Sequence, residues 1–313
     1  MEIRNLGRSG LRVSAIGLGC NNFGGRTDLE ASRAVIHKAL DLGVTLFDTA
    51  DIYAGSGGSE TVLGKVLGPA RKRIVLASKF GMAMDASGER QGGSRQWIMA
   101  EVEESLRRLN TDWIDLYQLH CPDPRTPIEE TLRALDDLVR QGKVRYCGCS
   151  NLPGWQVVEA AWTAREMGLT QFVSCQDEYS LLERGIEAEL LPAARAYGLG
   201  LLPFYPLAGG FLSGKYRPGA APAADTRLGK VPNLAKRFLT EANWARIDAL
   251  TAFAAARGKT LLELAFAWLL ARTPVASVIA GATKPEQLEQ NVKAGDWKLS
   301  AEECAEIDHL VSA

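Results

Sequence analysis

The sequence predicts an α/β protein built as a closed (β/α)8 barrel, the TIM barrel, with an N-terminal β-hairpin and extra C-terminal helices. From residue 15 onward, short apolar runs alternate with longer amphipathic stretches, which is typical of repeated βα units around a parallel sheet. Eight such runs can be counted, the number of strands in this barrel. The chain has 313 residues, 46% of them hydrophobic, and no low-complexity linker divides it. We therefore expect one barrel domain over residues 1–313.

The expected elements follow one another in a regular order. The first is a β-hairpin, because the segments EIRNLG and LRVSAIG flank the turn-forming residues Arg8, Ser9 and Gly10. The expected barrel strands are AIGLG (15–19), VTLFD (44–48), IVLASK (74–79), WIDLYQLH (113–120), VRYCGCS (144–150), FVSCQ (172–176), GLLPFYP (200–206) and VASVIAG (275–281). Helical patterns lie between them, and several end on the glycine or asparagine that often terminates a helix. The clearest cover residues 29–43, 95–110, 127–142 and 285–295.

Two regions depart from the alternation of strands and helices. Residues 207–240 are rich in Gly, Pro and Ala and predict a long functional loop after the seventh strand. Thr260 and Glu263 have the spacing of a capping box, which predicts a helix from there through Leu270. Ser300 and Glu303 form a second such pair, so a final helix is expected to run to the end of the chain.

Composition excludes several classes of function. The 36 Lys and Arg residues against 37 Asp and Glu leave a net charge of -1, so neither nucleic acid nor a membrane surface is an expected partner. The six cysteines include no C-x-x-C pair, which favours a reducing compartment. Only three histidines are present, so we expect no metal site. The first residues lack the apolar region of a signal peptide, and no run of 18 apolar residues occurs, which predicts a soluble, cytoplasmic protein.

Four polar residues lie where consecutive expected strands end. Asp48 closes the second run, Tyr53 follows in its loop, Lys79 closes the third run and His120 closes the fourth. Taken singly, each has a structural explanation: a helix cap, a rim aromatic, a solvated charge and a core imidazole. The catalytic residues of (β/α)8 barrels lie at the carboxyl ends of the strands, where all four are expected to face one mouth. Together they predict an active site.

Their chemistry suits a carbonyl group. An ammonium ion within about 4 to 6 Å of a phenol favours the phenolate, so Lys79 is expected to make Tyr53 a usable acid at neutral pH. Asp48 would keep Lys79 charged and oriented, and His120 could donate a hydrogen bond to the oxygen that Tyr53 protonates. None of these groups is a hydride source, so a reduction requires a cofactor.

Six segments of the sequence resemble the aldo-keto reductases along nearly the whole chain, in the order and spacing of that family. They are FDTADIY (47–53), ASKF (77–80), LYQLH (116–120), GCSN (148–151), FYPLAGGFLSGKY (204–216) and AGATKPEQLEQN (280–291). The resemblance implies a (β/α)8 barrel, NADPH as cofactor and a tetrad of Asp48, Tyr53, Lys79 and His120. It also implies reversible reduction of an aldehyde or ketone to the alcohol, with hydride from the nicotinamide and the proton from Tyr53.

The same resemblance implies a cofactor site. Ser150, Asn151 and Gln176 match residues that bond the nicotinamide carboxamide, and Phe204 matches an aromatic stacked on its ring. The full set implied for the cofactor is Cys20, Asn21, Asp48, Ser150, Asn151, Gln176, Phe204, Tyr205, Pro206, Leu207, Gly209, Lys215, Arg227, Gly281, Thr283, Gln287, Gln290 and Asn291. Residues 209–215 also nearly match a P-loop, but Tyr216 replaces the Ser or Thr that would bind magnesium, which disfavours NTP hydrolysis.

The sequence departs from the family pattern in two places. Gly281, Ala282 and Gln287 stand where many members carry a Lys-Ser pair and an Arg for the 2′-phosphate. NADH therefore stays open as the alternative cofactor, although Lys284 or Arg227 could supply the positive charge. Where many relatives have tryptophans, this sequence has Asn21 and Cys121. We therefore expect a more open substrate pocket, lined by Asn21, Asn22, Phe23, Tyr53, Phe80, Trp97 and Cys121; core packing explains Trp97 equally well.

Two alternative functions remain. Potassium-channel β subunits resemble the same family, so the protein could be a regulatory subunit that binds the cofactor, although we expect no partner-binding extension. A lyase that forms a Schiff base through Lys79 would require a neutral lysine, and Asp48 should keep Lys79 protonated. The expected partner is thus a small carbonyl or alcohol substrate, and the oligomeric state is left open.

Overall fold

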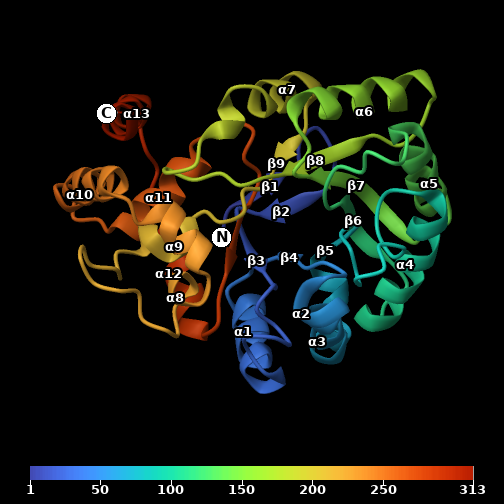
Figure 1. Ribbon diagram of the computed structural model, residues 1–313, viewed down its shortest axis with the longest axis horizontal. Coiled ribbons are helices and arrows are strands. Elements are labelled where there is room, and N and C mark those ends of the chain that lie inside the picture. The colour runs from blue at the N-terminus through green and yellow to red at the C-terminus, as the bar shows by residue number, and fades with distance from the viewer. Residues whose placement is uncertain (313) are drawn as a thin grey trace.

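A computed structural model describes residues 1–312, and it contains an eight-stranded parallel sheet with helices around it (Figure 1). The strand order is β10-β3-β4-β5-β6-β7-β8-β9. The two outer strands are joined through the segment before β10, because Leu201 forms a parallel bridge with Val275 and its N–H donates to Pro274 O at 3.0 Å. The sheet therefore curls into a barrel, and the predicted fold class is confirmed.

The barrel strands overlap the apolar runs that predicted them, and their bounds differ from those of the runs by up to a few residues. The strands are β1 (Ile3–Asn5), β2 (Arg12–Ser14), β3 (Ile16–Gly19), β4 (Leu46–Asp48), β5 (Val75–Phe80), β6 (Ile114–Leu119), β7 (Val144–Ser150), β8 (Phe172–Gln176), β9 (Gly200–Leu201) and β10 (Val278–Gly281). Strand β9 is much shorter than the run 200–206. Pro203 and Pro206 have no N–H for a ladder hydrogen bond, so the chain leaves the sheet there.

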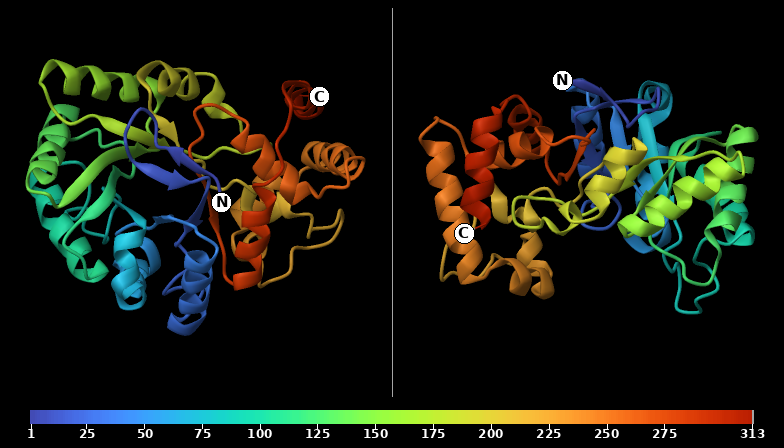
Figure 2. Two further views of the ribbon diagram at one scale, coloured as in Figure 1. Left: turned by 180° about the vertical axis from the view of Figure 1, so that it is seen from behind. Right: turned by 90° about the horizontal axis from the view of Figure 1, so that it is seen from above.

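The helices form the outer layer, and the described part of the chain contains several beyond those of the repeat (Figures 1 and 2). They are α1 (Leu29–Asp41), α2 (Tyr53–Ser56), α3 (Gly58–Leu67), α4 (Arg95–Leu109), α5 (Ile128–Arg140), α6 (Gly154–Glu166), α7 (Leu190–Tyr197), α8 (Arg227–Lys230), α9 (Pro232–Phe238), α10 (Glu241–Ala255), α11 (Leu261–Leu270), α12 (Pro285–Ala294) and α13 (Ala301–Ser312). Short 3-10 helices cover 68–73, 185–187 and 208–213.

Residues 207–240 are not the open loop that their composition predicted. They contain the 3-10 helix 208–213 and helices α8 and α9, because Thr226 accepts a hydrogen bond at the start of α8 and a proline begins α9. The two predicted capping boxes are present: Thr260 and Glu263 bond one another's backbone, and so do Ser300 and Glu303. They begin α11 and α13, of which α13 is described to residue 312 and not to Ala313.

The hairpin of β1 and β2 closes the end of the barrel at which the strands begin. Its residues Leu6 and Val13 are fully buried in the apolar cluster that fills the barrel interior. Gly7, with φ +57°, makes a close approach: a Cβ there would lie 2.5 Å from Gly198 O and 2.6 Å from Gly200 N. Gly200 is the first residue of β9. The plugged end is therefore the amino end of the strands, and the carboxyl end is left for a site (Figure 2).

No helix within residues 1–312 is both long enough and apolar enough to cross a lipid bilayer.

Candidate active site

The four residues of the expected tetrad meet at the carboxyl end of three neighbouring strands. Asp48 is the last residue of β4, Lys79 lies near the end of β5, and His120 follows β6. Tyr53 begins α2, directly after the β4 loop. Lys79 Nζ donates to Asp48 Oδ2 at 2.7 Å, to Thr49 O at 2.9 Å and to Tyr53 Oη at 3.3 Å. The rings of Tyr53 and His120 stand edge to face, 5.8 Å apart.

The Asp48 carboxylate is held on both oxygens. Lys79 uses Oδ2, while Gln176 Nε2 and Gln118 Nε2 donate to Oδ1 at 2.8 and 3.3 Å. All four side chains are buried. A buried charged group is stable only when its hydrogen bonds are satisfied. This network of hydrogen bonds therefore keeps Asp48 and Lys79 in one arrangement. Gln118 was not among the expected site residues; a polar residue inside the apolar run 113–120 is the signal that could have found it.

Burial and neighbouring charges set the protonation states. For Lys79, burial lowers the pKa, but the Asp48 and Tyr53 groups outweigh it, so the pKa is raised and the group is an ammonium ion. Burial, with a smaller effect of the Lys79 charge, lowers the pKa of His120 to about 3. His120 is therefore neutral near pH 7, with one N–H to donate.

The expectation that Lys79 makes Tyr53 acidic needs correction. The pKa of Tyr53 is raised above its usual value, because burial of the phenol raises it by more than the Lys79 ammonium lowers it; Asp48 also raises it. Lys79 acts in the expected direction but does not prevail. Tyr53 therefore keeps its proton at neutral pH, which is the form that a proton donor needs.

A pH-dependent stability follows from His120. Its pKa in the folded protein, about 3, lies below the unfolded value of about 6.5, so the unfolded chain takes up the proton first as the pH falls. The folded state should lose about 2 to 3 kcal/mol of stability through this group between about pH 7.5 and about pH 4.5. Urea unfolding of wild type and His120→Asn at both pH values measures it: wild type should lose that much more than the variant. Equal losses would contradict the assignment.

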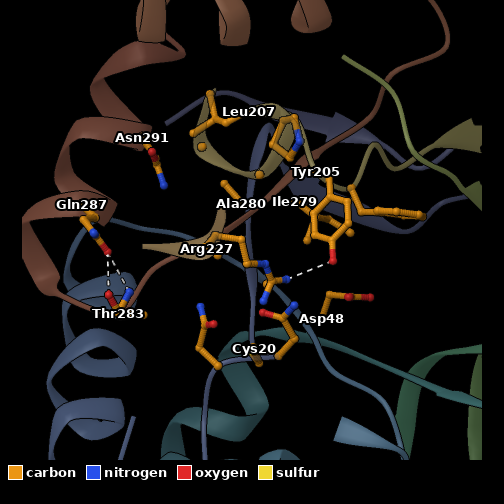
Figure 3. Close-up of a pocket in the computed structure, with 18 of the residues that line it drawn as sticks. Cys20, Asp48, Tyr205, Leu207, Arg227, Ile279, Ala280, Thr283, Gln287 and Asn291 are labelled. Carbon is orange, nitrogen blue, oxygen red and sulfur yellow. Dashed lines mark hydrogen bonds between the residues drawn. The ribbon is translucent and has the colours of Figure 1, made fainter. Parts of the chain in front are cut away.

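One large cavity opens from the tetrad, with a volume of about 760 Å³ (Figure 3). Asp48 lies at one end, and Thr283 and Gln287 lie at the other. Tyr53 and His120 also line the cavity. All the residues that the family resemblance implied for the cofactor lie on this cavity. Gln287 Oε1 accepts from Thr283 N at 2.8 Å and from its hydroxyl at 3.1 Å. A volume of this size is within the range of small-molecule and cofactor sites.

Cationic side chains line the cavity between its two ends. Arg227 donates to Tyr205 Oη at 3.1 Å, and its guanidinium lies 5.2 Å from the centre of that ring. Arg26 donates to Asn22 Oδ1 at 3.4 Å and to Asp225 O at 3.3 Å, so it joins two loops. The cavity is therefore suited to an anionic ligand. The sequence analysis did not identify the following lining residues: Gly19, Arg26, Met82, Ser213, Asp225, Thr226, Leu262, Ile279 and Ala280.

The structure places only some of the residues expected for the substrate pocket on the cavity. Of these residues, Asn21, Asn22 and Tyr53 line the cavity, whereas Phe23, Phe80, Trp97 and Cys121 do not. Successive side chains of a strand point to opposite faces, so when Lys79 enters the barrel, Phe80 must point outward to the helices. There its ring packs 4.7 Å from that of Tyr117. Met82, on the same loop, lines the cavity instead and is 37% exposed.

The other three residues pack elsewhere. Phe23 is fully buried in the main apolar cluster. Trp97, on α4, is only partly exposed, and the Arg90 guanidinium lies 5.5 Å from the centre of its ring. Cys121 is half-buried, with its Sγ 3.9 Å from Gly81 O.

The sequence matches a known protein family over nearly its whole length. The model of the Aldo/keto reductase family matches residues 15–312. The chain is 38% identical over 303 residues to a "Probable voltage-gated potassium channel subunit beta" of Oryza sativa subsp. japonica, covering 95% of this chain and 92% of that protein. It is 38% identical over 312 residues to the "Uncharacterized oxidoreductase YrpG" of Bacillus subtilis (strain 168), covering 96% and 93%.

A third relative has a named reaction. The chain is 36% identical to the "L-glyceraldehyde 3-phosphate reductase" of Escherichia coli (strain K12), over an alignment of 324 residues that covers 100% of this chain and 93% of that protein. The recognised resemblance is thus confirmed. The chain is an oxidoreductase of the aldo/keto reductase family, whose general reaction is NAD(P)H-dependent carbonyl reduction.

Proposed function

We propose that this protein reduces an aldehyde or ketone to the alcohol, reversibly, with hydride from NADPH and a proton from Tyr53. The observation that carries the proposal is the triangle of Asp48, Lys79 and Tyr53 at the end of the large cavity. A phenol beside a buried ammonium ion is suited to protonating a carbonyl oxygen. A Schiff base on Lys79 is disfavoured, because the amine is charged and bonded to Asp48.

The residues that line the cavity fit a dinucleotide. Asn151 Nδ2 donates to His120 O at 3.0 Å and to Ser150 Oγ at 2.9 Å, so Asn151 and Ser150 lie beside the tetrad. Together with Phe204, which also lines the cavity, they would hold the nicotinamide. Lys215 and Arg227 provide positive charge along the cavity for a diphosphate. His120 Nδ1 is buried and has no hydrogen-bond partner within residues 1–312. When bound, the reduced nicotinamide supplies the hydride for the carbonyl carbon.

The residues of the chain supply the proton. Tyr53 transfers its hydroxyl proton to the carbonyl oxygen and becomes a phenolate, which the Lys79 ammonium 3.3 Å away stabilises. Asp48 holds Lys79 in place at 2.7 Å, and the neutral His120 donates a hydrogen bond to the same substrate oxygen. Solvent then returns a proton to Tyr53. In the reverse direction the phenolate takes the proton from the alcohol.

We propose NADPH rather than NADH as the preferred cofactor. Gly281 and Gln287 carry no charge for a 2′-phosphate, but Lys284 lines the same end of the cavity and is exposed. Arg227 is already bonded to Tyr205. Lys284 is therefore the side chain that we propose for the 2′-phosphate, with Arg227 as the alternative.

A second candidate function rests on the relatives. One relative is named as a potassium channel subunit beta, so a regulatory subunit that binds the cofactor is also consistent with this chain. The two proposals differ in rate. A regulatory subunit would turn over slowly, retain NADPH tightly and form a stable complex with a partner protein, whereas a metabolic reductase would release NADP after each turnover.

The test is loss of NADPH absorbance with a panel of carbonyl compounds. The panel includes small aldehydes, ketones, sugars and L-glyceraldehyde 3-phosphate, the last because a relative is named for it. We expect turnover of at least one aldehyde, and a lower KM for NADPH than for NADH because the exposed Lys284 attracts the 2′-phosphate. Oxidation of a single equivalent of NADPH, followed by tight retention of the cofactor, would favour the regulatory subunit. No oxidation with any compound would overturn the proposal.

A further inference from the structure

A buried cluster of charged side chains lies outside the cavity, behind the segment that carries Tyr53. Glu60 on α3 and Glu101 on α4 are both fully buried, and Arg108 on α4 is 9% exposed. Arg108 Nε donates to Glu60 Oε2 at 2.6 Å, and its Nη2 donates to Glu101 Oε1. None of these residues lines the cavity. They therefore do not contact a ligand there.

Glu60 connects this cluster to the strand that carries Lys79. The hydroxyl of Ser78, the residue before Lys79, donates to Glu60 Oε1 at 2.5 Å. Ser78 points outward from the barrel, because side chains alternate along β5 and Lys79 points inward. The Glu60 carboxylate thus receives one hydrogen bond from β5 and one from α4, so both of its oxygens are tied to neighbouring elements.

The segment with Tyr53 is attached to β5 on both sides. Before Tyr53, the N–H of Thr49 donates to Ala77 O at 2.9 Å and that of Asp51 donates to Lys79 O at 3.2 Å. After Tyr53, the side chain of Glu60 makes the corresponding attachment. Tyr53 therefore lies between two points at which its segment is attached to β5, the strand that carries Lys79.

The part of the segment after Tyr53 has an unfavourable backbone. Residues 54–57 all have positive φ, including the non-glycine residues Ala54 at 57° and Ser56 at 65°. Such conformations cost about 1 to 3 kcal/mol each and persist only where the surroundings impose them. Arg108 packs against this turn: a Cβ on Gly57 would lie 2.2 Å from its Cδ. The Glu60 and Arg108 pair is thus in contact with the strained turn.

Burying this cluster of charged side chains costs free energy. A buried ion pair seldom stabilises a fold more than apolar residues of the same volume would, because each charge has lost its hydration. Here a third buried carboxyl, that of Asp51, is also near, and its Oδ2 has no hydrogen-bond partner within the part of the chain that the structure describes. Contribution to stability is therefore a poor reason for this arrangement, and geometric specificity is a better one.

We propose that Glu60, held by Arg108, is a positioning residue that sets the separation of Tyr53 Oη and Lys79 Nζ. The inference rests on the proposed function for its effect on turnover, but the separation itself does not depend on it. The titratable groups that face Tyr53 are Lys79 from β5, Asp48 from β4, His120 after β6 and Tyr205 after β9. Glu60 acts on Tyr53 only through the backbone.

The test replaces Glu60 by Gln and, separately, Ser78 by Ala. Glu60→Gln should lower kcat by about 10- to 100-fold with little change in KM, because a shift of about 1 Å at the acid is enough. It should also move the rising limb of the pH profile for alcohol oxidation to higher pH, since a more distant Lys79 lowers the pKa of Tyr53 less. Ser78→Ala removes only the link to β5 and should cause a smaller change in the same direction, which decides the matter if Glu60→Gln does not fold.

The direction of the pH shift separates positioning from a direct charge effect. Loss of the Glu60 charge alone would move the limb to lower pH, because it removes a negative charge. Asp115→Asn is the matched control: it breaks the partly buried pair with Arg71, at 2.7 Å, near the other end of the barrel. It should lower stability and leave kcat and the pH profile unchanged.

A second readout does not depend on turnover. In protein labelled with 3-fluorotyrosine, the fluorine NMR signal of Tyr53, assigned by its loss in Tyr53→Phe, should titrate at higher pH in Glu60→Gln and in Ser78→Ala than in wild type. If the wild-type protein is inactive but the variants show this shift, the proposed function is contradicted and the positioning role is supported. Unchanged kcat, pH limb and fluorine titration in the folded variants would overturn the role of Glu60.

Discussion

Replacing Tyr53 by Phe should lower kcat for carbonyl reduction by roughly 10²- to 10⁴-fold, the usual contribution of a positioned proton donor. The hydroxyl lies 3.3 Å from Lys79 Nζ and on the wall of the cavity, so it can reach both the ammonium and a substrate. Phe keeps the ring that stands edge to face with His120. The measurement is kcat with NADPH and the best aldehyde of the panel, together with the Kd of NADPH.

Cofactor affinity separates loss of chemistry from loss of folding. The Kd of NADPH should change little in Tyr53→Phe, because the ring and the cavity are kept. Tyr146→Phe is the matched control, since its hydroxyl lies beside Gly10 of the loop between β1 and β2, at the opposite end of the barrel. That variant should retain full kcat. Equal turnover by wild type and Tyr53→Phe would show that another group donates the proton.

Replacing Lys79 by Met should remove activity and also lower the free energy of unfolding by about 3 to 5 kcal/mol. Lys79 is fully buried, and its removal leaves the buried Asp48 carboxylate without its cation. Catalysis is lost for a different reason: the phenolate that forms when Tyr53 gives up its proton would have no positive charge beside it. Urea unfolding and kcat measured on the same preparations report the two effects.

The double variant Asp48→Asn with Lys79→Met separates the loss of stability from the loss of catalysis. Neutralising the carboxylate removes the unpaired charge, so most of the lost stability should return while kcat stays low. Lys298→Met is the control, because its pair with Glu2 is exposed and should be worth at most about 1 kcal/mol. Full activity in Lys79→Met, or no loss of stability, would contradict the role given to the Asp48 and Lys79 pair.

Much of the fold could be predicted because periodicity and end signals are local. The eight apolar runs became the eight barrel strands, and the Thr260 and Ser300 capping boxes begin helices as expected. The run 200–206 was the exception: Leu201 and Leu202 are buried, but Pro203 and Pro206 cannot join a ladder, and Phe204 and Tyr205 line the cavity instead. Residues 207–240 differ because the local signals within them, the Thr226 cap and the proline at the start of α9, were not recognised in a segment rich in Gly, Pro and Ala.

Those site residues that lie at the carboxyl ends of strands could be predicted from the sequence. Parallel strands all end at one edge, so Asp48, Lys79 and His120 had to come near one another once the barrel was assumed. The substrate wall was not predictable in this way. Whether Phe80 or Met82 faces the cavity depends on the phase of β5 and on the path of the following loop. Arg26 is a comparable case, because it reaches the cavity through contacts with Asn22 and Asp225 that lie far apart in the sequence.

The sequence by itself determined the order of the elements, the family and the chemical types that gather at the mouth of the barrel, because each is encoded in local pattern and spacing. Only the tertiary structure decided the protonation states. The raised pKa of Tyr53 and the lowered pKa of His120 result from how deeply the fold buries each ring beside Lys79. The Glu60 cluster is likewise a product of packing: α3, α4 and β5 must come together before its charges can meet. Burial and charge separation depend on the whole chain at once, so no local pattern contains them.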